Sequence, residues 1–297
     1  MPLEDFIIAV LCCVEQMWPK DPRLSRLRPR GFAPKLADSE VITMEIVGEF
    51  LGFDSDQQIW KYFSSHWKPW FPTLGSRSTF ARQAANLWYI KQLLHQKVAW
   101  QLGAYTDSIH MIDGFPVPIC QFARAKRCKL FPGAASYGYC ASKDETYKGF
   151  HGHVIIDFHG TITGVIFTAA NTDERIAMFD LVNPIRGLLI GDKGYISQEV
   201  KTDLQDHYGI ELQTPLRSNM KDDRDPLYVS QLMKTRRLVE TVIGQLSDHF
   251  HIEKVRARDL WHLTSRVARK VLAHTVAVFL NRHLGRAPLQ FEGLITV

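Results

Sequence analysis

The sequence predicts an α/β fold in which a small helical region precedes a mixed β-sheet flanked by helices. The length of 297 residues, at roughly 150 residues per domain, indicates about two domains. Up to about residue 105, apolar residues recur at the three- and four-residue spacing of helices. From about residue 107, short apolar runs typical of strands alternate with helical stretches in the order β-β-β-α-β-α-β-α. We therefore predict domains over 1–105 and 106–297.

The composition is that of a folded globular protein, with 45% hydrophobic and 23% charged residues. The 36 Lys and Arg residues outnumber the 31 Asp and Glu residues only slightly, so a polyanionic partner is permitted but not required. Five cysteines without a C-x-x-C pair indicate neither a disulfide framework nor a zinc site, which favours a reducing cytoplasm. The apolar run Phe6 to Val14 follows Glu4 and Asp5, lacks the basic start of a signal peptide and is too short to span a bilayer, so we expect no membrane insertion.

Two helices are expected in the first domain. One begins at Asp38 or Ser39 and ends at Gly52. The other begins near Ser76 or Ser78, runs to Val98 and turns Arg77 and Arg82 away from its apolar face. Between them, the aromatic residues of segment 60–71 could stack on unpaired bases, although a core beneath the helices is the favoured interpretation. Segment 20–35 has six basic residues and three prolines, and it is either a phosphate-binding arm or a solvated linker.

The second domain is expected to contain short strands connected by helices. A strand in SIHMIDG ends at Asp113, and HVIIDFHGTITGVIFT forms a hairpin that turns at His159 and Gly160. The strand RGLLIGD ends at Asp192. The remaining predicted elements are helices over 172–182, 198–207, 230–250 and 262–284, and a strand over 210–214.

Three acidic residues stand out because of their positions. Asp113 and Asp192 each follow a predicted strand, and chemistry in open α/β sheets gathers beyond the carboxyl ends of strands. Glu240 lies on a flank of its predicted helix, four residues after Arg236 and three after Arg237, so all three can reach one groove. Carboxylates brought together repel one another unless hard divalent cations lie among them, which indicates Mg²⁺ or Mn²⁺. Two such ions suit phosphoryl transfer on nucleic acid.

Basic residues could supply a DNA-binding surface. Within segment 121–148, the basic side chains outnumber Asp144 and Glu145, and we expect contact with DNA there through Arg124, Lys126, Arg127 and Lys129. Near the C-terminus the same surface could continue through Arg256, Arg258, Arg266, Arg269 and Lys270, with a solvated helix face as an equal alternative. His151 and His153 alternate along a strand and could bind a metal, but without a third ligand a structural role is favoured.

Five segments, in order, resemble a known family: MIDGFPV, YKGFHGHVIIDFHGTITGVIFTAANTDER, LLIGDKGYIS, LQTPLRSNMK and RRLVETVIGQL. Together they are similar to the DDE transposases of bacterial insertion sequences, specifically the insertion-sequence-982 group. The resemblance covers about 105–285, with a looser likeness at SRSTFARQ. The sequence departs from the family pattern at His151, where the family has Lys, and at Gly152, where the family has an apolar residue.

The resemblance implies an RNase H-like catalytic core with Asp113, Asp192 and Glu240 as the catalytic, metal-binding triad. It also implies two Mg²⁺ ions, for which Mn²⁺ can substitute, and a homo-oligomer acting on element ends and target DNA. Lys193, Arg236 and Arg237 would hold phosphate, and the helical domain with Arg77 and Arg82 would recognise the ends. An RNase H-like nuclease without strand transfer and a catalytically inactive DNA-binding remnant are the alternatives.

Overall fold

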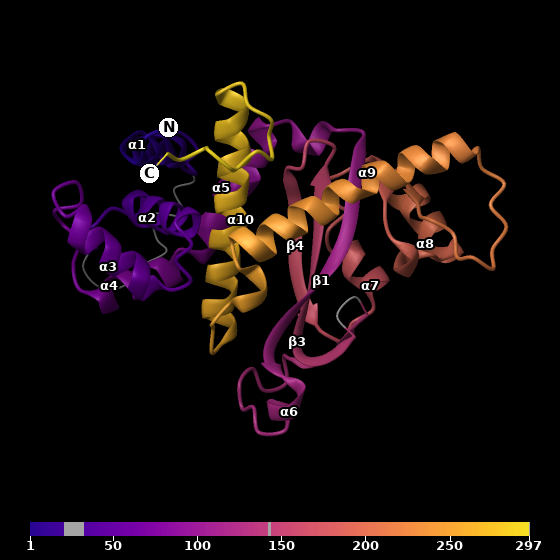
Figure 1. Cartoon of the computed structure of the whole chain (residues 1–297), viewed down its shortest axis with the longest axis horizontal. Coiled ribbons are helices and arrows are strands. Elements are labelled where there is room, and N and C mark those ends of the chain that lie inside the picture. The colour runs from indigo at the N-terminus through magenta and orange to yellow at the C-terminus, as the bar shows by residue number, and fades with distance from the viewer. Residues whose placement is uncertain (21–32, 142–143, 297) are drawn as a thin grey trace. The chain divides into compact units, whose positions relative to one another are not determined.

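The computed structural model describes residues 1–20, 33–141 and 144–296, and the chain forms two compact units (Figure 1). Unit 1 comprises Met1–Val98 together with Asp248–Val297, and unit 2 comprises Ala99–Ser247. We expected 248–297 to belong with the sheet, whereas these residues cluster with the N-terminal helices. The reason is helix α10 (Leu260–His283), whose middle is buried on nearly all sides against α1, α2 and α4.

Unit 1 is helical, as predicted for the N-terminal region. It contains α1 (Leu3–Gln16), α2 (Asp38–Phe50), α3 (Asp56–His66) and α4 (Arg77–Asn86), and α5 (Trp88–Gln101) begins in it. The predicted helix from Ser76 to Val98 is two helices, because the chain turns at Leu87. Ser76 caps α4 by accepting a hydrogen bond from the Thr79 amide at 3.3 Å.

The aromatic segment contributes to the core, as favoured from the sequence. Phe63 and Phe71 are buried and meet edge to face, with ring centroids 5.3 Å apart. Trp70 remains exposed. Of the basic segment 20–35, residues 21–32 lie outside the described residues.

A buried ionic cluster joins α2, α5 and α10. Lys91 donates to both carboxylate oxygens of Glu45 at 2.9 Å, Arg269 donates to Glu49, and Lys270 donates to Glu49 at 2.7 Å. All five side chains are at most 2% exposed. The expectation that Arg269 and Lys270 extend a basic surface is therefore wrong, because both charges are neutralised inside the unit.

Unit 2 is built on a mixed sheet flanked by helices, which confirms the predicted fold class. The strands run in the order β2-β3-β1-β5-β6, and β4 pairs with β3 beside β2. Strand β5 is parallel to both β1 and β6, and the other pairings are antiparallel. The strands are β1 (Ile109–Gln121), β2 (Ser136–Cys140), β3 (Glu145–Asp157), β4 (Ile162–Ala169), β5 (Gly187–Ile190) and β6 (Ile210–Gln213).

The helices of unit 2 that follow β4 lie close to their predicted positions, whereas the short helix after β1 was not predicted. The short helix α6 (Phe122–Ala125) follows β1, α7 (Glu174–Phe179) follows β4, and α8 (Gln198–Asp203) precedes β6. The long helix α9 (Pro226–Gly244) packs against β1 and β3 (Figure 1). A core of Ile112, Ile155, Met178, Leu189 and Leu212 joins the sheet to α7.

Three features of the sheet differ from the prediction, one of which is that β3 begins at Glu145, eight residues before the predicted start at His153. Strand β1 extends to Gln121, eight residues beyond Asp113, because Gly114 to Gln121 continue to pair with β3. Strand β2 was not predicted at all. Within the described ranges, the protein has no helix with the length and apolarity needed to traverse a bilayer.

Candidate functional site

The parallel pairing of β1 with β5 brings Asp113 and Asp192 to the same end of the sheet. Met111 and Ile190 form the last pair of that ladder, and each aspartate lies two residues further along its own chain segment. Asp113 is therefore inside β1 rather than at its end as predicted, but it lies just beyond the parallel part of the sheet. This is the region where the chemistry of α/β sheets gathers.

Asp113 lies in a largely buried environment at the contact with α9. One carboxylate oxygen accepts the Gly114 amide at 2.8 Å, and the other accepts Arg236 at 3.2 Å. Burial raises the pKa of Asp113 to about 6, against the lowering effect of the Gly114 amide and Arg236, and the negative charges of Asp192 and Glu240 add to the rise. Asp113 is thus within electrostatic reach of both Asp192 and Glu240.

Helix α9 places Glu240 at this site through Arg236. The Arg236 guanidinium donates to Glu240 at 2.5 Å as well as to Asp113, so it bridges the two carboxylates. Arg236 is 17% exposed and Glu240 is 49% exposed. Arg237, the next residue, is exposed on the helix surface.

Asp192 organises the turn after β5. Its side chain accepts the Gly194 amide at 2.6 Å and caps the 3₁₀ turn Lys193–Tyr195. Lys193 is exposed, whereas Tyr195 is completely buried. The Tyr195 hydroxyl has no hydrogen-bond partner among the described residues.

A fourth carboxylate, Glu174 at the start of α7, was missed from the sequence. Its Oε2 and the Oδ1 of Asp192 lie 2.7 and 2.9 Å from the point that a Cβ on Gly194 would occupy. Burial raises the pKa of Glu174 to about 7, and the charges of Asp192, Asp113 and Asp173 contribute to the rise. The available signals were its place shortly after the predicted hairpin and its inclusion in the family-like segment that ends in TDER.

The two histidines of β3 lie at the edge of this acidic cluster. His151 and His153 stack with ring centroids 4.7 Å apart, and His151 Nε2 lies 3.5 Å from Glu174 Oε1. A Cβ on Gly114 would be 2.3 Å from His151 Nε2, so the absence of a side chain there gives the imidazole its place. Burial lowers the pKa of both histidines.

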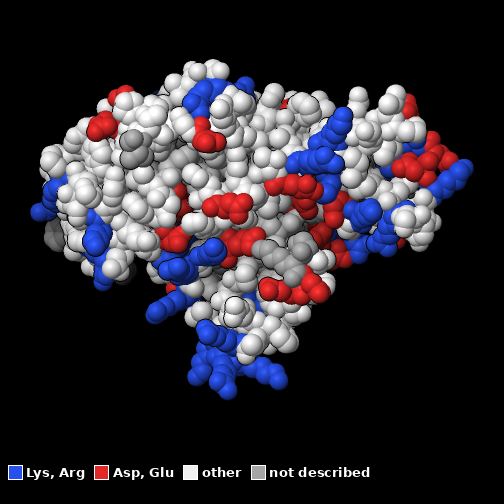
Figure 2. All heavy atoms as spheres, in the orientation of Figure 1, with Lys and Arg blue, Asp and Glu red and all other residues white. Residues whose placement is uncertain are grey.

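The other predicted DNA-binding residues lie elsewhere. A basic tip is formed by α6 and the residues directly after it, and Figure 2 shows its charges gathered at the bottom of the view. Its members are all exposed, and none forms an ion pair within the described ranges; they are Arg124, Lys126, Arg127 and Lys129. Arg77 and Arg82 are exposed on α4 in unit 1.

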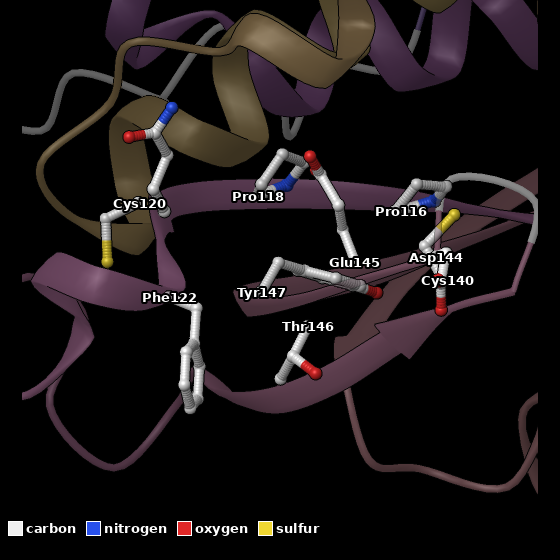
Figure 3. Close-up of a pocket in the computed structure, with 10 residues that line it drawn as sticks. Pro116, Pro118, Cys120, Phe122, Cys140, Asp144, Glu145, Thr146 and Tyr147 are labelled. Carbon is white, nitrogen blue, oxygen red and sulfur yellow. The ribbon is translucent and has the colours of Figure 1, made fainter.

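A cavity of about 560 Å³ is lined by residues of β1, β2, β3 and α6, the helix that carries Arg124 of the basic tip (Figure 3). Strand β1 contributes Pro116 and Pro118 to its wall, and Tyr147 of β3 and Phe122 of α6 lie within it. None of the predicted catalytic residues lines this cavity.

The donor set suits a hard divalent cation, although its present arrangement does not gather three ligands. Among the described residues, no three His, Cys, Asp or Glu side chains are close enough to hold one ion. Near Asp113 the reason is Arg236, which occupies the space between that carboxylate and Glu240. The carboxylates offer only oxygen ligands. Burial raises the pKa of Asp113 and of Glu174, neighbouring negative charges add to the rise, and a bound cation would relieve that repulsion.

Comparison with known proteins indicates that this chain is related to transposases. A family model described as "Transposase DDE domain" matches residues 103–260, more than half of the chain and the whole of the site above. No curated protein matches. Among solved structures, the chain is similar to the piggyBac transposase synaptic complex with hairpin DNA, with a TM-score of 0.51 at 12% identity. The similarity covers 97% of this chain and 76% of that one.

The solved structure supports the fold, and the family model, which spans all three predicted acidic residues, identifies the family. The chain therefore belongs to the DDE transposases, enzymes that cleave DNA and transfer its strands.

Proposed function

We propose that this protein is an insertion-sequence transposase of the insertion-sequence-982 group, which binds the ends of its element and catalyses metal-dependent DNA cleavage and strand transfer. The observation that carries the proposal is the β1–β5 register, which brings Asp113 and Asp192 to one end of the sheet. The ordered motifs MIDGFPV, LLIGDKGYIS and RRLVETVIGQL support the assignment to this group.

In this proposal Asp113, Asp192 and Glu240 hold two Mg²⁺ ions, for which Mn²⁺ can substitute. Bound between the carboxylates, the ions would supply activation of the attacking oxygen and stabilisation of the leaving oxygen at the phosphodiester. Arg236 holds Asp113 and Glu240 in the free protein. A DNA phosphate would offer Arg236 an alternative partner, because a guanidinium binds phosphate oxygens as well as carboxylate oxygens in a bidentate manner.

The remaining charged residues would bind DNA outside the reaction centre. Lys193 and Arg237 are exposed beside the carboxylates and would contact the backbone near the cleaved bond. The basic tip would hold DNA further along, and unit 1, with Arg77 and Arg82 on α4, would recognise the element ends. Since two ends must be joined to one target, we propose that the protein acts as a homo-oligomer on DNA. We also propose that it works in the cytoplasm.

A strand-transfer assay with pre-cut element ends, a supercoiled target and Mg²⁺ or Mn²⁺ tests the function. Asp113→Asn, Asp192→Asn and Glu240→Gln should each lower joined product on the order of 10³-fold, because each removes several kcal/mol of transition-state stabilisation. Glu199→Gln, on the exposed surface of α8, is the matched control and should keep full activity.

Two other outcomes would contradict the proposal. Cleavage without joined product would identify a nuclease, and DNA binding that is independent of the three acidic residues, without cleavage, would identify an inactive remnant. The group assignment has its own test, which is the DNA on either side of the reading frame. Short inverted repeats bordered by a small target duplication are expected there.

A further inference from the structure

We propose that Glu174 and Asp192 together bind a divalent cation in the DNA-free protein, before Glu240 joins the site. This inference rests on the proposed function, because it adds a carboxylate to the same reaction centre. It departs from the predicted triad in one respect: the first ion is held by a pair that includes Glu174 and excludes Glu240.

The geometry places the Glu174 carboxylate between the segments that carry the two aspartates. One of its oxygens and one Asp192 oxygen approach within 3 Å of the same point, the Cβ position that Gly194 lacks, at 2.7 and 2.9 Å. Its other oxygen lies 3.3 Å from the Cβ position that Gly114 lacks, next to Asp113. The two glycines thus leave room for the carboxylate to enter.

The distribution of positive charge separates this pair from the other two carboxylates. Asp113 and Glu240 share the Arg236 guanidinium. Within the described ranges, neither Glu174 nor Asp192 has a Lys or Arg within 4.0 Å, and the one ion-pair contact of Glu174 is His151 at 3.5 Å. Two neighbouring carboxylates without a cationic side chain are the pair that an external cation would stabilise most.

The Tyr195 hydroxyl supplies an independent indication of a ligand. It is completely buried and has no hydrogen-bond partner in the described structure, which is costly for a hydroxyl. Burial raises the pKa of Tyr195 well above its usual value, and the negative charges of Glu174, Asp113 and Asp192 add to the rise, Glu174 the most of the three. The hydroxyl is therefore within electrostatic reach of these carboxylates. A hydrated cation at this place would bring water molecules able to satisfy it.

The chemistry of the pair matches Mg²⁺ or Mn²⁺. Mg²⁺ dehydrates reluctantly and is commonly held by one or two carboxylates with several waters, so it does not need three protein ligands. The backbone around the pair is also firmly held. Asp173 caps α7 and pairs with Arg175, α7 packs against the 3₁₀ turn Lys193–Tyr195, and Asp192 caps that turn.

Titration of the full-length, DNA-free protein with Mn²⁺ alone tests the proposal, with free Mn²⁺ measured by electron paramagnetic resonance. The wild type should bind Mn²⁺, and Glu174→Gln and Asp192→Asn should each weaken the affinity at least about 10-fold through loss of one charged ligand. Glu240→Gln should change it less than about 2-fold, because Arg236 engages Glu240 in the free protein. Glu199→Gln is the surface control, and thermal melting confirms that each variant is folded.

Three results would overturn the proposal. The first is that the wild-type protein binds no Mn²⁺ without DNA. The second is that Glu174→Gln binds Mn²⁺ with wild-type affinity. The third is that Glu240→Gln lowers the affinity for Mn²⁺ as much as Asp192→Asn does. Failure here is distinguishable from failure of the proposed function. If Glu174→Gln binds Mn²⁺ normally while Asp113→Asn, Asp192→Asn and Glu240→Gln abolish strand transfer, the transposase proposal stands and only the role of Glu174 is lost.

Discussion

Gly149 is a residue whose lack of a side chain is needed for the sheet to form. It lies in β3 between β1 and β2, paired with Pro118 and Ser136, and a Cβ there would be 2.2 Å from the Val117 carbonyl oxygen. Gly149→Ala should therefore destabilise the protein by about 1–3 kcal/mol or more, because backbone atoms must move. Gly244→Ala at the end of α9, with nothing within 4 Å, is the control. Urea unfolding measures both, and equal stabilities would contradict the prediction.

His153 should make the stability of the protein depend on pH. The side chain is buried beside Thr168, and burial, with a contribution from His151, lowers its pKa to about 4. An unfolded histidine has a pKa of about 6.5, so between about pH 6.5 and 4 the unfolded state binds more protons than the folded state. The free energy of unfolding should therefore fall as the pH falls through this window. His153→Gln should make that slope shallower, and an unchanged slope in chemical unfolding would refute the assignment.

At the scale of secondary-structure elements, the buried ionic cluster ties α5 to α2 and α10. Lys91 donates to Glu45, to Ser265 at 2.8 Å and to the Ala84 carbonyl at 3.0 Å. Lys91→Met should cost about 3–5 kcal/mol of unfolding free energy, because it leaves buried Glu45 with only the longer contact to Arg269. Adding Glu45→Gln should recover part of the loss, and Lys61→Met on the exposed face of α3 is the control. Denaturant unfolding measures the free energy of unfolding of each variant. If the loss in the double variant equals the sum of the losses in the two single variants, this coupling is contradicted.

For the whole molecule, the basic tip predicts a salt-dependent affinity for DNA. If its four charges contact phosphates, the logarithm of the association constant for DNA should fall linearly with the logarithm of the salt concentration. The slope should be about −0.9 for each phosphate contacted. Replacing Arg124, Lys126, Arg127 and Lys129 by Ala should make the slope shallower by up to about 3 to 4. Lys221→Ala, whose ammonium already pairs with Asp223 at 2.8 Å, should leave it unchanged. Fluorescence anisotropy of labelled DNA between about 50 and 300 mM salt, where this effect is large, measures the slope. If the affinity of the wild type does not change with salt, the basic tip does not bind DNA phosphates.

Predictability from sequence also differs with scale. The positions of β5, β6, α8 and α10 followed from apolar periodicity and turn residues, which act over a few neighbours. The end of β1 could not be predicted in the same way. Its residues from Gly114 to Gln121 include two prolines and remain in a strand because β3 pairs with them from some thirty residues away.

The sequence by itself determined the order of most elements, the family-specific motifs and the identity of Asp113, Asp192 and Glu240 as the residues to examine. Only the tertiary structure decided which charges meet: Arg236 bridges Asp113 and Glu240, Glu174 approaches Asp192, and Arg269 lies buried with Glu49. The physical reason is that a local pattern shows the type of a charged residue but not its partner. The partner depends on segments distant in the chain, which approach one another only when the sheet and the helical core have formed.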